Sequence, residues 1–201
     1  IFDSPEGDVC FALQVPGLHN VRNAVAAGAA ATAAGASLVA VARGLSAFSA
    51  VKGRLQRKQG RKGAVVIDDT YNANPDSVRA AIDVLAAGPA LASTANGAAT
   101  AAPVAGERVL VLGDMGEVGS QGPAFHVEIG RYARERGVSR LLLAGEATRH
   151  TATAFGAGAK HFERFEDLLP FALACDAPGA TVLVKGSRFM RMEREPLTST
   201  V

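Results

Sequence analysis

The chain has 201 residues, of which 48% are hydrophobic and 20% charged, and this suits one α/β domain, or one domain with part of another. Its formal net charge of +2 is too small to indicate nucleic-acid binding by itself. Cys10 and Cys175 are not spaced as metal ligands, so we expect buried thiols rather than a disulfide or a zinc site. No apolar run predicts a membrane span. The chain begins with Ile1 rather than Met, so we expect it to be a fragment.

The first fifty residues predict strands followed by two helices. Val9–Val15 is the clearest strand. Asn20 is a candidate N-cap for an alanine-rich helix that continues to about Ala34, and a second short helix is expected over 37–48. Asn23 shares a helix face with Asn20, because residues three apart are neighbours on a helix. The two amides can contact a planar heterocycle or an anion; the alternative is a cap and a surface amide.

A basic segment from Lys52 to Lys62 follows and contains six positive charges. Gln59 and Gly60 predict a hairpin turn inside it. Most of these charges suit a solvated loop or an edge hairpin. Arg54 is the better candidate for a phosphate contact, because it precedes an apolar position near the expected domain junction. No aromatic residue lies among the charges, which argues against nucleic-acid binding.

The stretch from Gly63 to Val78 predicts a buried strand, a polar turn and the start of a helix. Ala64–Ile67 is an unbroken apolar run, as expected for a strand covered on both faces. Asn74 is a good N-cap and Pro75 fits the first helical position. Polar groups crowd the turn between strand and helix, which is where ligands bind in open α/β sheets. They belong to Asp68, Asp69, Tyr71, Asn72 and Asn74.

The rest of the chain repeats a strand-then-helix pattern, which predicts a Rossmann-like doubly wound α/β sheet with right-handed crossovers. Strands are expected over 109–112, 141–144, 160–162 and 181–184, and helices over 123–136, 147–155, 165–172 and after Arg188 to about Glu195. Residues 86–106 are mostly small and are interpreted as a surface insertion. His126 lies one residue off the apolar face of its helix, so we expect a surface histidine or a satisfied core histidine.

Polar residues follow four of the predicted strands, and a parallel sheet places these strand ends along one edge, as a ligand site requires. They are Asp68 and Asp69, Asp114, Glu146, and Lys185 with Ser187. The sequence contains no G-x-x-x-x-G-K-[ST] phosphate loop, no G-x-G-x-x-G fingerprint between strand and helix, and no nucleophile elbow. A complete catalytic apparatus is therefore not visible in this sequence.

Five segments resemble the Mur ligase family and occur in the order that the family has. They are residues 16–24 (PGLHNVRNA), 53–56 (GRLQ), 67–75 (IDDTYNANP), 112–119 (LGDMGEVG) and 184–188 (VKGSR). The second and last segments are short, whereas the third and fourth are specific and resemble the branch of the family that adds D-alanyl-D-alanine. The first is shared across the wider family.

The resemblance implies a three-domain ligase of the cytoplasm. Residues 1–50 would be the tail of the central ATP-binding domain, and residues 51–201 the C-terminal Rossmann-like domain. The phosphate loop and the magnesium ligands would lie upstream of Ile1, in the missing N-terminal and central domains. The chain alone is therefore expected to be inactive.

The activity that the resemblance implies uses ATP and Mg²⁺ to phosphorylate the carboxylate of UDP-N-acetylmuramoyl-tripeptide, after which the amine of D-alanyl-D-alanine attacks the acyl phosphate. Asn20 and Asn23 match the adenine side, Arg54 the terminal phosphates and Asp69 the ribose, with Arg54 and Asp69 in catalytic positions. A fixed guanidinium would stabilise the charge on the transferring phosphoryl group. The expected contacts of the dipeptide are Tyr71, Asn72, Asn74, Asp114, Lys185 and Arg188.

Other interpretations remain open. A sister Mur ligase or a folylpolyglutamate-type ligase would share the fold, although Tyr71–Pro75 argues against it. A non-catalytic Rossmann-like binding module would need no ATPase domain. A flavodoxin-like signalling domain would need a phosphorylatable aspartate, which Asp68 or Asp69 with Lys185 resembles only superficially.

Overall fold

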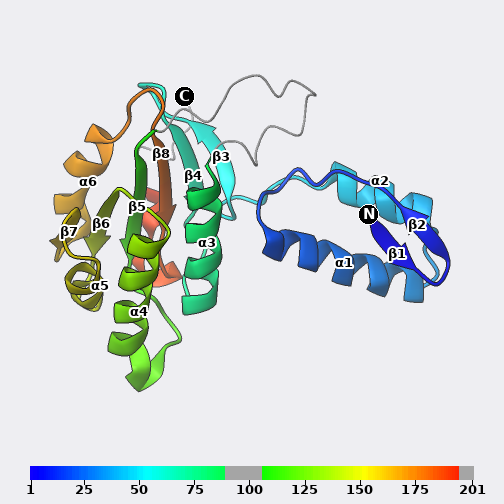
Figure 1. Cartoon of the computed structure of the whole chain (residues 1–201), viewed down its shortest axis with the longest axis horizontal. Helices are drawn as coiled ribbons and strands as arrows, with labels where there is room; N and C mark the ends of the chain where they lie inside the picture. Colours follow the sequence, from blue (N-terminus) through cyan, green and yellow to red (C-terminus); the bar gives the residue numbers. More distant parts are fainter. Residues whose placement is uncertain (89–105, 195–201) are drawn as a thin grey trace.

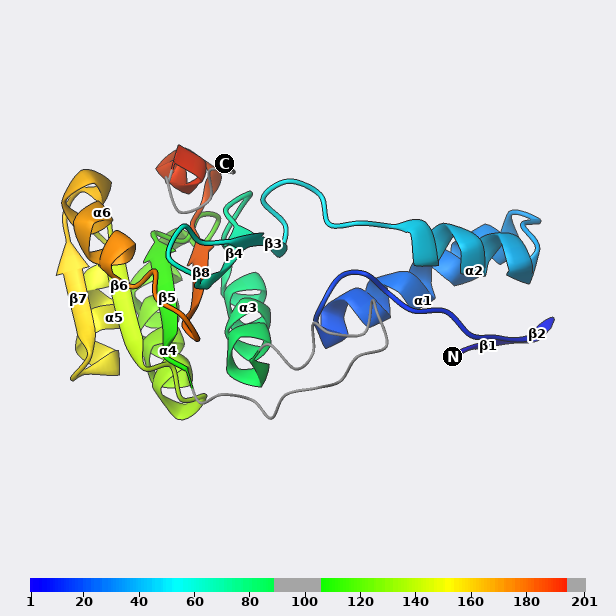
Figure 2. The ribbon, with the colours of Figure 1, turned by 90° about the horizontal axis from the view of Figure 1, so that it is seen from above.

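The computed structural model describes residues 1–88 and 106–194. A small N-terminal part lies beside a larger α/β part, and a segment after α2 connects the two (Figures 1 and 2). The N-terminal part contains an antiparallel ribbon, β1 (Phe2–Ser4) with β2 (Gly7–Val9), and two helices, α1 (Leu18–Ala33) and α2 (Leu38–Ala47). None of the helices in the described ranges has the length and apolar character that a membrane crossing requires.

The α/β part is built on a six-stranded sheet in the order β3-β4-β8-β5-β6-β7. Its strands are β3 (Gln56–Gln59), β4 (Val65–Asp69), β5 (Arg108–Gly113), β6 (Arg140–Ala144), β7 (Ala159–Phe162) and β8 (Thr181–Lys185). All neighbours pair in parallel except β3, which forms an antiparallel hairpin with β4 at one edge. The Rossmann-like parallel sheet is confirmed, and so is the hairpin in the basic segment.

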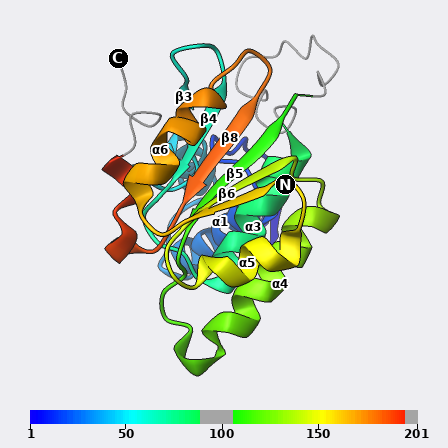
Figure 3. The same cartoon turned by 90° about the vertical axis from the view of Figure 1, so that its left-hand side faces the viewer.

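Helices cover both faces of this sheet (Figure 3). α3 (Pro75–Ala87), α4 (Gly122–Glu135) and α5 (Thr148–Phe155) pack on one face, and α6 (Phe165–Ala174) packs on the other. Successive residues of a strand point to opposite faces, so Leu110 enters the core under α3 to α5 whereas Val111 enters the core under α6. This two-sided burial explains why the central strands are almost continuously apolar.

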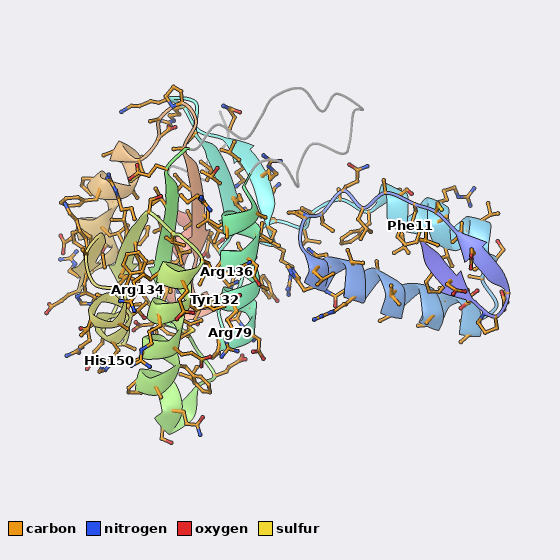
Figure 4. The ribbon with its side chains drawn as sticks, viewed as in Figure 1. Phe11, Arg79, Tyr132, Arg134, Arg136 and His150 are labelled. Carbon is orange, nitrogen blue, oxygen red and sulfur yellow. The ribbon has the colours of Figure 1, made fainter. Side chains whose placement is uncertain are left out.

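The contact between α3 and α4 also carries exposed charges (Figure 4). Arg79 of α3 pairs with Glu128 of α4, and the hydroxyl of Tyr132 donates to Asp83 at 2.6 Å. The Arg136 guanidinium lies 5.9 Å from the centre of the Tyr132 ring. These contacts are at the surface, so we assign them a small role in stability.

Three predictions for the N-terminal part were wrong: the extent of a strand, the burial of Cys10 and the N-cap of α1. No strand runs over Val9–Val15. β2 ends at Val9, because Val9 pairs with Phe2, the first residue of β1, and the residues after Val9 have no described strand beside them to pair with. Cys10, just beyond it, is exposed, whereas Cys175 is buried as expected. The apolar pattern over Val9–Val15 therefore does not correspond to a strand beyond Val9.

The N-cap of α1 is Gly17, not Asn20. Gly17 has φ 100°, a conformation that side chains rarely adopt, so it starts the helix three residues early. Asn20 lies within the first turn, where its amide nitrogen donates to the Pro16 carbonyl at 2.7 Å. The helix-cap alternative for Asn20 is thereby removed.

The helix expected after Arg188 is replaced by two short 3₁₀ turns, η3 (Arg188–Met190) and η4 (Met192–Arg194). Arg191 between them has φ 49°, a left-handed conformation that interrupts any continuous helix. Another short turn, η2 (Gly119–Gln121), precedes α4. Of the predicted insertion over 86–106, the first two residues belong to α3, and 89–105 lie outside the described residues.

Candidate functional site

A cavity of about 260 Å³ lies between the start of α1, the connecting segment and the carboxyl edge of the sheet. Residues from both parts of the chain line it. Eight of the ten predicted site residues are among them: Asn20, Asn23, Arg54, Asp69, Tyr71, Asn72, Asn74 and Lys185. The structure therefore brings together most of the residues that the motifs singled out.

The turn between β4 and α3 supplies three of these eight residues, and a capping box holds it in place. Asn74 accepts a hydrogen bond from the Ser77 amide at 2.9 Å, and the Ser77 hydroxyl accepts one from the Asn74 amide at 3.0 Å. Pro75 occupies the first turn, as predicted. Asn74 is thus committed to the helix start while it also lines the cavity.

Asp69 and Lys185 form a buried ion pair at the floor of the cavity. The Lys185 ammonium donates to Asp69 at 2.5 Å and to the Asn72 carbonyl at 2.8 Å, and Lys185 is only 2% exposed. The Leu55 amide donates to the other Asp69 oxygen at 3.2 Å. Burial raises the pKa of the Asp69 carboxyl, and Lys185 and the Leu55 amide oppose that shift. Much of the hydrogen-bonding capacity of Lys185 is therefore used inside the protein.

Asp68, the residue before Asp69, points into a different environment. It is 1% exposed, pairs with Lys58 of β3 at 2.8 Å and accepts from the Thr70 hydroxyl at 2.7 Å. Successive strand residues face opposite sides of the sheet, which separates the two carboxylates. Asp68 holds β3 to β4 within the edge hairpin, whereas Asp69 faces the cavity.

Arg54 presents its guanidinium to the cavity from the connecting segment. Its guanidinium carbon lies 4.1 Å from the centre of the Tyr71 ring. The described residues provide no ion-pair partner for it, and the side chain is exposed. It is therefore available to an anion.

Asp114 and Arg188 do not line this cavity. The Asp114 carboxylate accepts from the Thr148 amide at 2.9 Å, at the positive end of α5, so it stabilises that helix start. Arg188 lines a second cavity of about 920 Å³. Asn72 lines both cavities, so the two lie side by side at the same edge of the sheet.

His19 lines the first cavity and was not predicted as a site residue. Burial lowers its pKa; the negative charge of Asp69 opposes this shift and the positive charge of Lys185 adds to it. Phe48 and Val51 provide apolar wall. The motif around Asn20 includes His19, but no spacing rule indicated that its ring would face the same cavity as Asp69.

Ser187 ties together the three loops that follow β4, β5 and β8. Its hydroxyl donates to the Ala73 carbonyl at 2.9 Å and accepts a hydrogen bond from the Gly116 amide. Its own amide donates to the Asp114 carbonyl at 3.1 Å. The side chain is 1% exposed, so this network is structural and keeps the cavity edge in one arrangement.

His126 is a satisfied core histidine, one of the two predicted alternatives. It is fully buried; its Nε2 accepts from the Met115 amide at 3.3 Å, so the other nitrogen, Nδ1, donates to the Thr151 hydroxyl at 2.8 Å. It thereby connects the loop after β5 to α5. Burial lowers its pKa to about 4.

This lowered pKa predicts a loss of stability in acid. The unfolded chain binds a proton to His126 at about pH 6.5, whereas the folded chain does so only near pH 4. The contribution of neutral His126 to the free energy of unfolding is therefore complete above pH 6.5. We expect about 3 kcal/mol of this free energy to be lost as the pH falls from 6.5 to 4. Urea unfolding at several pH values, compared with His126→Phe, measures this. Parallel pH dependences of the two proteins would contradict it.

Comparisons with known proteins relate the chain to one family of ligases. A family model described as "Mur ligase, glutamate ligase domain" matches residues 53–188. The chain is 38% identical over 192 residues to the UDP-N-acetylmuramoyl-tripeptide–D-alanyl-D-alanine ligase of Escherichia coli, an alignment that covers 94% of this chain and 39% of that protein. The chain thus spans about two fifths of the length of this curated relative.

Solved structures of other proteins have a similar fold. A crystal structure of MurF from Acinetobacter baumannii superposes with a TM-score of 0.79 and 34% identity, and covers 95% of this chain and 39% of that one. A MurF from Thermotoga maritima in complex with ADP has a TM-score of 0.72 at 21% identity, covers 90% of this chain and 37% of that one, and supports the fold alone. Because the family model matches more than half of the described sequence, the chain belongs to the Mur ligase family.

Proposed function

We propose that this chain is part of an ATP-dependent ligase that joins D-alanyl-D-alanine to UDP-N-acetylmuramoyl-tripeptide in cytoplasmic peptidoglycan-precursor synthesis. The observation that carries the proposal is one cavity that gathers amides from α1, the guanidinium of Arg54 and the carboxylate of Asp69. Relatives that carry the name of this reaction share 38% and 36% of their aligned residues with the chain.

We also propose that residues 1–50 belong to the central ATP-binding domain and residues 51–201 to the C-terminal domain. The family match begins at residue 53, which supports a boundary near this point. The cavity would then lie at the junction of two domains, a common position for ligand sites.

The nucleotide would occupy the first cavity. Asn20 and Asn23 would face the adenine, Asp69 the ribose and Arg54 the terminal phosphates. The Thermotoga maritima MurF, which has a similar fold, was solved in complex with ADP. Within the described residues no three His, Cys, Asp or Glu side chains are placed to hold a metal, so we assign no Mg²⁺ ligand to them.

The proposed reaction has two steps. A carboxylate oxygen of the tripeptide attacks the terminal phosphorus of ATP, and ADP leaves. The amine of the dipeptide then attacks the acyl carbon, phosphate leaves with the bonding electrons, and the nitrogen loses a proton to water or to the departing phosphate. Arg54 would stabilise negative charge on the phosphoryl group in the first step. Closure of one domain on the other would exclude water, which otherwise hydrolyses the acyl phosphate.

The dipeptide would bind where the two cavities meet. Tyr71, Asn72 and Asn74 line the first cavity, and the exposed guanidinium of Arg188 suits a carboxylate in the second. Asp114 and Lys185 already have partners in the protein, so their contribution would be to hold this edge in shape.

Phosphate release by the full-length protein that carries this chain tests the proposal. UDP-N-acetylmuramoyl-tripeptide and ATP are supplied with D-alanyl-D-alanine or with single amino acids. We expect release only with the dipeptide, and none from residues 1–201 alone. Release with a single amino acid would instead indicate a sister ligase, and no release with any acceptor would indicate a binding module.

A further inference from the structure

Tyr71 lines the first cavity, and its ring contacts one arginine from the lining of each cavity. The guanidinium carbon of Arg54 is 4.1 Å from the centre of the ring, and that of Arg188 is 5.8 Å from it. Arg54 lines the first cavity and Arg188 the second. One ring therefore holds the cation that faces the proposed nucleotide and the cation that faces the proposed acceptor.

The backbone fixes the position of the ring relative to Arg54. The Tyr71 amide donates to the Gly53 carbonyl at 3.0 Å. Gly53 has φ 72°, and a Cβ added there would lie 3.2 Å from the Tyr71 nitrogen, so a side chain would strain this contact. The arginine that follows Gly53 is thereby held beside the ring.

The ring does little for the stability of the fold. Tyr71 is 47% exposed and belongs to neither hydrophobic core. Its two arginines have few competing partners among the described residues: Arg188 reaches Glu193 at 3.7 Å, and Arg54 has no ion pair. Two guanidinium groups near one ring repel each other, and an anion close to both relieves that repulsion.

We infer that Tyr71 is a positioning residue that couples the two cavities: its ring orients Arg54 toward the nucleotide phosphates and Arg188 toward the carboxylate of the acceptor. This rests on the proposed function. An exposed contact between a cation and an aromatic ring changes an equilibrium about two- to fivefold. Loss of the ring should therefore weaken the binding of both the nucleotide and the acceptor by that factor. It should also reduce the effect that binding of one ligand has on the affinity for the other.

The experiment compares Tyr71→Leu, which removes the ring, with Tyr71→Phe, which keeps it. The Kd of the non-hydrolysable ATP analogue AMP-PNP is measured by calorimetry on the full-length protein, with and without D-alanyl-D-alanine. We expect Tyr71→Leu to raise this Kd about two- to fivefold, to raise the KM of the dipeptide similarly, and to reduce the effect of the dipeptide on AMP-PNP binding. Tyr71→Phe should restore all three values.

The second tyrosine of the chain provides a matched control. Tyr132 also contacts an arginine, Arg136, but on the surface between α3 and α4 (Figure 4). Tyr132→Leu should leave the Kd of AMP-PNP unchanged. The melting temperature of Tyr71→Leu should stay close to that of the wild type, since the ring is outside both cores.

Three outcomes would overturn the inference alone: equal Kd values for wild type and Tyr71→Leu, a change confined to the KM of the dipeptide, or equal defects in the Leu and Phe variants. In the last case the hydroxyl, not the ring face, would be the active group. A wild-type protein that does not bind AMP-PNP would overturn the proposed function, and this inference with it.

Discussion

Asp69→Asn is expected to lower the free energy of unfolding by about 3–5 kcal/mol, because it leaves the Lys185 ammonium buried beside a neutral amide. Lys185 is 2% exposed, so water cannot replace the lost carboxylate. The asparagine still offers an oxygen to the Leu55 amide, which now bonds to Asp69 at 3.2 Å. The loss therefore reports on the charge pair. Urea unfolding at pH 7 measures it.

A double-mutant cycle separates the interaction energy of Asp69 with Lys185 from the contribution of each side chain alone. Lys185→Met removes the cation and leaves Asp69 with the Leu55 amide, and the double variant removes both charges. We expect the double variant to be more stable than Asp69→Asn, since it no longer buries an unpaired charge. Losses that simply add would mean that the two side chains do not interact energetically.

Arg54→Ala is expected to reduce kcat of the proposed ligase reaction in the full-length protein about 10²- to 10³-fold, with little change in stability. The reason is that Arg54 has no ion pair within the described residues and is exposed, so the fold does not need its charge, whereas a transferring phosphoryl group would. Arg54→Lys should recover only part of the rate, because an ammonium cannot reproduce the planar, two-point contact of a guanidinium.

Arg61→Ala is the matched control for Arg54. Arg61 belongs to the same basic segment, in the turn between β3 and β4, and is exposed but does not line the cavity. Its removal should leave kcat within about twofold, as for most surface substitutions. An Arg54→Ala enzyme within about threefold of the wild type would remove Arg54 from the proposed phosphate site.

Sequence patterns predicted the elements of the α/β part well, because local chemistry and burial agree there. The apolar run before Asp68 marked a strand buried on both faces, and Asn74 with Pro75 marked the start of α3. The N-terminal ribbon and the end of the chain were predicted less well. The start of α1 depended on Gly17 and the break after β8 on Arg191, both with positive φ, which residue type alone does not reveal.

Motif order and strand pattern are properties of the chain, so they were sufficient to predict the family, the parallel sheet and most of the residues around the cavity. How those residues pair their charges depends on the three-dimensional fold. Asp69 and Lys185 become partners because β4 and β8 pair in parallel with these two residues opposite each other, although 116 positions separate them. The same folding directs Asp114 to the start of α5, and brings Arg54 and Arg188 to one tyrosine ring. Strand register and loop geometry set these contacts, and neither can be predicted from the residues near each position in the sequence.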